Sequence, residues 1–144
     1  MKDQSQTPPF DLGTYMPFQL SVITARLFQN ILGDAGFQVP EWRILMTLPA
    51  HQPCSSNDLC VLTAMDAARV SRAQRRLEDL GLITVIRDAA DRRRLIVQLT
   101  TVGQVECDRL LDAAQQVERD FLARLGPEDR ATLQSAIGGL FRRG

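Results

Sequence analysis

A helix followed directly by two β-branched runs constrains the fold more than any other feature of the sequence. Asp66 is a favourable N-cap, and residues 67–80 then carry apolar side chains at three- and four-residue steps, as in an amphipathic helix. Gly81 supplies the residue type that commonly ends a helix. The β-branched runs follow at 82–87 and 95–99. The sequence therefore predicts a helix and a hairpin with a polar tip.

Arginines are concentrated in this same segment. Between Arg69 and Arg94 there are eight arginines and four acidic residues, although the whole chain has 17 basic and 17 acidic residues and no net charge. Arginines recur along one side of the predicted helix and again at the hairpin tip. Because the guanidinium fork suits phosphates and guanine edges, this cluster favours double-stranded DNA as a partner.

A short helix precedes the arginine-rich one. Ser55 can cap a helix over roughly 56–62, and a tight turn then leads to Asp66. Two helices joined in this way, followed by a basic hairpin, predict a winged helix-turn-helix, with the second helix in the major groove and the wing in the minor groove. The candidate DNA-contacting residues are Ser55, Ala67, Arg69, Ser71, Arg72, Arg76, Arg92, Arg93 and Arg94.

Both ends of the chain are predicted to be helical. The expected helices span 12–32, 39–48 with Pro49 as the stop, about 101–125, and the residues after Gly126-Pro127. The first and the last two have apolar stripes that one small lobe cannot cover, so we expect a homodimer on an inverted repeat. The predicted fold is mainly α with a small β-hairpin wing. It forms a single domain over 1–144, with a winged helix-turn-helix lobe at about 39–100 and dimerisation helices at about 10–36 and 101–144.

Several motifs together resemble the MarR family of bacterial transcription regulators. They are Trp42-Arg43-Ile44-Leu45, Ser55 through Cys60, Val70-Ser71-Arg72, Arg76 through Ile83, and Asp91-Arg92-Arg93 before Leu99-Thr100. The resemblance implies an obligate homodimer with interleaved terminal helices. It also implies that Arg72 reads bases, that Arg93 enters the minor groove, and that Asp91 braces the wing through an arginine, unless Asp91 is only a turn residue. Arg69 and the Ala89-Ala90 tip depart from the family pattern.

Two kinds of sensing are open on the sequence. Tyr15, Phe18, Trp42 and Arg43 could form a pocket for an aromatic carboxylate, or serve as ordinary core and a surface ion pair. Cys54, just before a helix N-terminus, is the one candidate redox sensor, because a thiolate would be stabilised there. Packing is the expected role of Cys60 and Cys107. His51 is expected in an exposed loop.

The sequence contains no metal-ligand spacing, phosphate loop or catalytic motif, so we expect neither a metal nor a cofactor nor an enzyme. The main prediction is a repressor released by a small-molecule effector. The alternatives are a redox-responsive regulator acting through Cys54, and a winged-helix module that docks a protein and has no DNA site. The arginine stripe could also be a solvated face, and for Arg75 we expect an ion pair with Asp79. With no apolar span or secretion signal, we expect a cytoplasmic protein that does not enter membranes.

Overall fold

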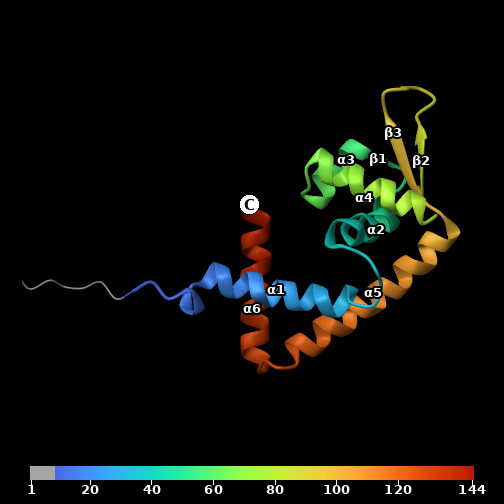
Figure 1. The fold of residues 1–144 in the computed structure, drawn as a ribbon. Coiled ribbons are helices and arrows are strands. Elements are labelled where there is room, and N and C mark those ends of the chain that lie inside the picture. Colours follow the sequence, from blue (N-terminus) through green and yellow to red (C-terminus); the bar gives the residue numbers. More distant parts are fainter. Residues whose placement is uncertain (1–8) are drawn as a thin grey trace, which may run out of the picture.

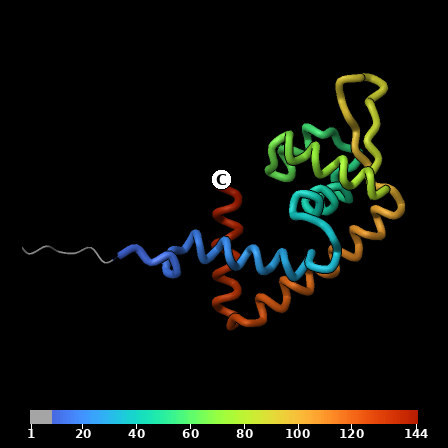
Figure 2. The backbone as a smooth tube through the Cα atoms, in the orientation of Figure 1, coloured from blue at the N-terminus to red at the C-terminus, as the bar shows by residue number. Residues whose placement is uncertain are grey.

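Six α-helices and three short strands make up residues 9–144, the part of the chain that the computed structural model describes (Figure 1). In chain order the elements are η1 (Leu12–Thr14), α1 (Met16–Leu32), α2 (Val39–His51), β1 (Cys54–Ser55), α3 (Ser56–Thr63), α4 (Ala67–Asp79), β2 (Ile83–Arg87), β3 (Leu95–Leu99), α5 (Thr101–Leu122) and α6 (Pro127–Arg143). Helices α2 to α4 and the strands form a lobe at one end. Helix α5 leads away from this lobe and packs along α1, and α6 lies at the far end (Figure 2).

The hydrophobic core lies where α2, α4, α5 and the sheet meet. Its fully buried side chains are Ile44, Leu45, Leu48, Leu59, Val70, Leu77, Ile83, Val97, Cys107 and Leu110. Burying each large aliphatic side chain contributes about 1.5–3 kcal/mol. Val70, Ala73 and Leu77 face this core, so packing fixes the rotation of α4 about its axis and turns its arginine-bearing side outward.

The hairpin forms as predicted, and a third strand joins it. Strands β2 and β3 pair antiparallel from Ile83–Leu99 to Arg87–Leu95, and the strand order is β1-β3-β2. Strand β1 has only two residues and pairs Cys54 with Val97. Two residues are too few to show the alternation that reveals a strand in a sequence, so β1 was not predicted. We call β2, β3 and the loop 88–94 between them the wing.

The predicted helix caps are confirmed. The Asp66 side chain accepts a hydrogen bond from the Arg69 amide at 2.8 Å, and Ser55 accepts one from Asp58 at 3.0 Å. Gly81 has a φ of +71°, the left-handed conformation that a helix end often requires. These caps satisfy amides that have no partner inside the helix, which is why α3 and α4 start where the sequence predicts.

Two predicted helix boundaries were wrong. The expected helix 12–32 is divided, because Tyr15 is extended and Pro17, which has no amide hydrogen, lies in the first turn of α1. The second helix continues through Pro49 to His51. A proline there leaves the Leu45 carbonyl without its helical donor. The Cys107 thiol donates to that carbonyl at 3.1 Å, so a partner from α5 satisfies it.

The terminal helices leave apolar side chains uncovered within one protomer. Helix α6 buries none of its residues, and Phe141 is 86% exposed. Met16 and Leu20 of α1 and Ile137 and Leu140 of α6 are also exposed. Large exposed apolar patches mark surfaces that associate. Over residues 9–144, no helix is both long enough and apolar enough to cross a membrane.

Gly103 is a position where the fold tolerates no side chain. A Cβ at this residue would come 1.9 Å from the Leu82 carbonyl oxygen, which is backbone. We predict that Gly103→Ala lowers the free energy of unfolding by about 2–3 kcal/mol, as overpacking does, even though alanine favours helices. Urea unfolding followed by circular dichroism measures this. Thr101→Ala, at an exposed position of the same helix, should change stability by less than about 0.5 kcal/mol. Equal effects of the two substitutions would contradict the packing.

Candidate nucleic-acid interface

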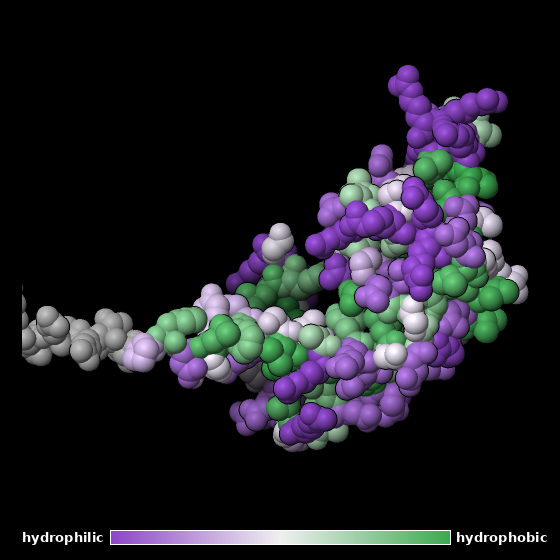
Figure 3. Space-filling view, viewed as in Figure 1, coloured by the Kyte–Doolittle hydropathy of each residue, from purple (hydrophilic) through white to green (hydrophobic). Residues whose placement is uncertain are grey.

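Helix α4 presents an exposed polar face. Ala67, Arg69, Ser71 and Arg72 are all exposed on it. Arg69 lies 3.5 Å from Asp66, its own N-cap, whereas Arg72 has no ion pair or hydrogen bond to another side chain in residues 9–144. Figure 3 shows hydrophilic side chains over this part of the lobe and at the tip of the wing. Arg72 is therefore free to make a bidentate contact with a base edge.

The tip of the wing is held by hydrogen bonds to its own carbonyl groups. The Asp88 amide donates to the Arg94 carbonyl at 2.9 Å, and the Arg87 guanidinium donates to the Arg92 carbonyl at 2.9 Å. These bonds close the loop, while Arg92 and Arg93 are exposed at its end. An ordered loop with free guanidinium groups is suited to insertion into a narrow minor groove.

Asp91 does not brace the wing through an arginine. Its carboxylate accepts a hydrogen bond from the Arg93 amide at 3.0 Å, and no ion pair in the described part of the chain involves it. The bond spans two residues, as in an Asx turn. The alternative interpretation of Asp91 as a turn residue is therefore correct.

Arg94 connects the wing to α3. Its guanidinium lies 3.4 Å from the Asp58 carboxylate. Hydrogen bonds from Ser55, above all from its backbone amide, lower the pKa of Asp58, and the charge of Arg94 lowers it further. The same carboxylate thus caps α3 and holds the base of the wing. Arg94 was predicted to contact DNA, and the structure gives it this internal partner.

Two other predicted contact residues are placed differently from expectation. Ser55 is only 3% exposed, because β1 pairs with β3 and its hydroxyl caps α3. Arg76 turns away from the free face of α4. Its Nε lies 3.3 Å from the buried Glu41 carboxylate, and it donates to the Gly36 carbonyl at 3.2 Å. The arginine spacing alone could not distinguish this partner from DNA. Arg75 and Asp79 form no ion pair among the described residues, contrary to expectation.

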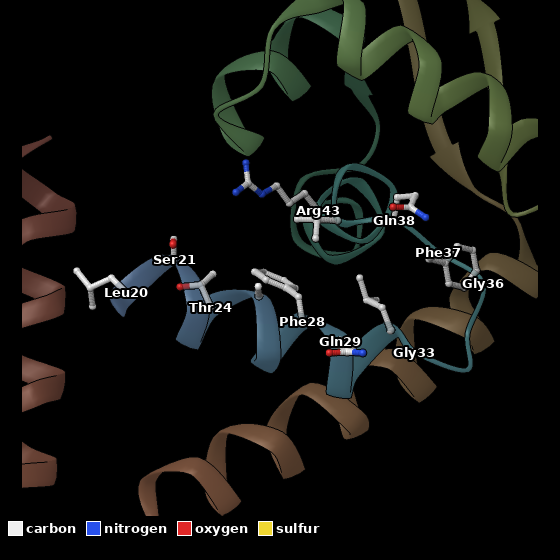
Figure 4. A pocket seen from close by; sticks show the side chains of 13 residues that line it. Leu20, Ser21, Thr24, Phe28, Gln29, Gly33, Gly36, Phe37, Gln38 and Arg43 are labelled. Carbon is white, nitrogen blue, oxygen red and sulfur yellow. The ribbon is translucent and has the colours of Figure 1, made fainter. Parts of the chain in front are cut away.

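A cavity of about 810 Å³, open to solvent in the single protomer, lies between α1 and α2. Figure 4 shows Ser21, Thr24 and Phe28 rising from α1 beneath Arg43 of α2. Arg43 is the one charged side chain in its lining, which also includes Leu20, Ala25, Gln29, Leu32, Gly33, Gly36, Phe37, Gln38 and Val39. An apolar cavity with one cation suits a small organic anion.

Of the four predicted pocket residues, only Arg43 lines this cavity. Trp42 packs edge-on against Phe28, with ring centroids 5.1 Å apart, and Tyr15 packs against Phe10 at 5.4 Å. Phe18 is exposed on α1. The sequence did carry a signal for the missed wall, since Leu20, Thr24 and Phe28 recur every four residues, but such a stripe is usually core.

Cys54 does not have the environment that was expected of a redox sensor. Cys54 is buried, and burial first, then the nearby Asp58 carboxylate, raises the pKa of its thiol. This is the opposite of the thiolate stabilisation that was predicted. Burial raises the pKa of Cys107 to about 11.

His51 is exposed as expected but ends α2 and does not lie in a loop. Within 9–144 no three His, Cys, Asp or Glu side chains cluster as metal ligands.

The fold and this polar surface define a winged helix-turn-helix protein. A family model described as the MarR family matches residues 35–94. The crystal structure of a probable transcriptional regulator from Pseudomonas aeruginosa is 35% identical, with a TM-score of 0.80, over 90% of this chain and 99% of that one. The chain belongs to the MarR family of transcriptional regulators.

Two further relatives carry more specific descriptions. The HTH-type transcriptional repressor NicR of Pseudomonas putida is 28% identical over 107 residues, which are 74% of this chain and 68% of that protein. BpsR of Bordetella bronchiseptica, whose DNA binding is regulated by 6-hydroxynicotinic acid, is 25% identical, with a TM-score of 0.79, over 92% of this chain and 96% of that one.

Asp58 makes stability depend on acid. A carboxyl whose pKa is lowered on folding stabilises the protein above its unfolded pKa, and this contribution is lost as pH falls through the folded value. We predict that Asp58→Asn unfolds more easily at pH 7 and loses less stability than the parent below about pH 4. Thermal unfolding between pH 7 and pH 2 measures both. Asp79→Asn, at an exposed carboxylate, is the control and should follow the parent. If Asp58→Asn loses stability at low pH to the same extent as the parent, the stabilising role of the Asp58 carboxylate is contradicted.

Thiol accessibility tests the correction at Cys54. We predict that Cys54 and Cys107 of the folded protein react with a maleimide at pH 7 at least about tenfold more slowly than in the urea-unfolded chain, because both are buried as neutral thiols. Peptide mass spectrometry after timed labelling assigns each site. Rapid labelling of folded Cys54 would restore it as a candidate sensor.

Proposed function

We propose that this protein is a homodimeric repressor that binds an inverted-repeat operator through α4 and the wing. The observation that carries the proposal is the free guanidinium of Arg72 on α4 beside a wing with exposed Arg92 and Arg93. Arg72 is assigned to guanine edges in the major groove, and Arg93 to the minor groove. Ala67, Arg69 and Ser71 lie on the same exposed face of α4 and complete the contact surface.

Dimerisation is supported by the uncovered terminal helices. Helix α6 buries no residue in its own protomer, and the exposed apolar side chains of α1 and α6 need a covering surface. A second copy related by a two-fold axis covers equivalent patches on both chains. In this arrangement residues of about 10–36 and 101–144 form the dimer region, and about 39–100 form the DNA-binding lobe. Two recognition helices about 34 Å apart then face successive turns of one side of the duplex.

The α1–α2 cavity is proposed as the effector site. Its apolar walls, its hydroxyl groups from Ser21 and Thr24, and its single cation Arg43 match an aromatic carboxylate. The regulation of BpsR by 6-hydroxynicotinic acid, itself an aromatic acid, supports this class of effector. We propose that binding there favours a dimer whose lobes no longer match the operator. A preference of about 1–3 kcal/mol for that state changes DNA affinity 5- to 150-fold.

Arg72 and Arg93 separate two kinds of DNA contact. We predict that Arg72→Ala weakens operator binding by about 1–3 kcal/mol and flattens base preference, whereas Arg93→Ala weakens binding to all sequences more evenly. Footprint titration on an operator selected from random duplexes, and on single-base variants of it, measures both. Arg119→Ala, at an exposed position of α5, is the control of equal charge; it should bind like the parent once gel filtration has shown that it is still a dimer.

The salt dependence of binding distinguishes DNA recognition from protein docking. Operator affinity should fall with log[salt] by about 0.9 for each phosphate neutralised. If both arginine variants bind like the parent, or the slope is flat, the DNA-binding assignment is wrong and the lobe is better explained as a protein interaction module.

A further inference from the structure

Arg43 lies between the cavity and the helix-turn-helix. It arises from the second turn of α2 and lines the cavity opposite the side chains of α1 (Figure 4). At the same time its Nη1 donates a hydrogen bond to the Thr63 carbonyl at 3.2 Å. Arg43 therefore lines the candidate effector site, while its guanidinium extends to the last residue of α3.

The Thr63 carbonyl needs a hydrogen-bond donor from outside its own helix. Thr63 is buried, and α3 ends there because Ala64 takes the left-handed conformation with a φ of +53°. The last carbonyls of a helix have no partner inside it and need one from elsewhere. Among residues 9–144, Arg43 is the only side chain that donates to this carbonyl. It thereby fixes the turn that leads into Asp66 and α4.

A second connection holds the other half of α4. Glu41, 5% exposed, accepts one hydrogen bond from the Gln38 amide at 2.8 Å and lies 3.3 Å from Arg76 Nε. Arg76 also donates to the Gly36 carbonyl. The first two turns of α2 thus hold α4 near its C-terminal half through Arg76, and the turn before its N-terminus through Arg43.

An anion in the cavity competes for only one of these connections. Arg43 is the one charged group of the lining, and a carboxylate forms stronger, charge-assisted and often bidentate hydrogen bonds to a guanidinium than a neutral carbonyl does. The Glu41–Arg76 pair involves a carboxylate already and is not displaced in the same way. Loss of the Thr63 contact would free the N-terminal end of α4 while Arg76 still holds the other half.

We infer that Arg43 is a positioning residue that transmits occupancy of the cavity to α4 by exchanging the Thr63 carbonyl for a ligand carboxylate. In the unliganded protein Arg43 holds the α3–α4 turn in the form that fits DNA. When a carboxylate binds the guanidinium, the turn loses its hydrogen bond, and α4 leaves the position in which it fits the major groove. This inference rests on the proposed function, since it assumes operator binding and an acidic effector.

The test uses the full-length chain, its selected operator and three variants. Arg43→Gln removes the charge, and Arg43→Lys keeps it. Arg119→Gln makes the same charge change at an exposed position of α5, and gel filtration checks that this variant remains a dimer. The probes are benzoate and 6-hydroxynicotinate, with benzamide as the neutral control. Operator affinity is measured by fluorescence anisotropy with and without each probe. Hydrogen exchange of the Ala64 and Met65 amides reports on the turn, and thermal unfolding shows whether each variant is folded.

We expect Arg43→Gln to bind the operator at least about tenfold more weakly than the parent and to lose any further response to the two acids. Ala64 and Met65 should exchange faster in this variant, and equally in the parent with either acid, but not with benzamide. Arg43→Lys should restore part of the operator affinity, and Arg119→Gln should match the parent.

Three results would overturn the inference while leaving operator binding intact. Arg43→Gln could bind like the parent, it could be weakened yet released by the acids as the parent is, or neither acid could affect the parent. If Arg43→Gln is unfolded, Arg43→Lys decides. The coupling is contradicted if, with either acid present, its operator affinity and the exchange of its Ala64 and Met65 amides both remain at the values of the acid-free parent. Failure of the parent to bind any duplex instead contradicts the proposed function.

Discussion

The packing of α4 against α2 is the constraint on which the rest of the structure depends. Val70 and Leu77 are buried against the core that Ile44 and Leu48 provide, and each such side chain contributes about 1.5–3 kcal/mol. This packing leaves α4 one possible rotation about its axis. The arginines on its outer side are exposed because of the apolar stripe on its inner side, so the recognition surface is a consequence of the core.

Polar contacts then fix the positions of the wing and of the C-terminal half of α4 relative to the core. Asp58 joins the cap of α3 to Arg94 of the wing, and Glu41 joins the start of α2 to Arg76 of α4. Each contact uses an arginine from the basic segment, so that segment supplies both the free guanidinium groups and the internal ones. A chain without net charge can therefore present a basic face, because its arginines are concentrated in one segment and its acidic residues lie mostly elsewhere.

Local patterns predicted the elements well, and tertiary partners decided where prediction failed. The caps at Ser55 and Asp66, the helix end at Gly81 and the hairpin follow from neighbouring residues, and all are present. The continuation of α2 through Pro49 could not be predicted, because its compensating donor, Cys107, is distant in sequence. Arg76 has the same spacing as Arg72 and differs from it only in its tertiary partner, Glu41, and the side chains of α1 that line the cavity follow the spacing of a core stripe. Composition and spacing do not encode such partners.

Hydroxyl-radical footprinting of the selected operator tests the central claim most directly, because it reports the geometry of the bound pair on DNA. The account predicts two equivalent protected patches, symmetric about the centre of the site and about 34 Å apart, with protected minor-groove sugars beside each where the wing inserts. A single unpaired patch, or two patches without the flanking minor-groove protection, would contradict a symmetric dimer that presents α4 and the wing together.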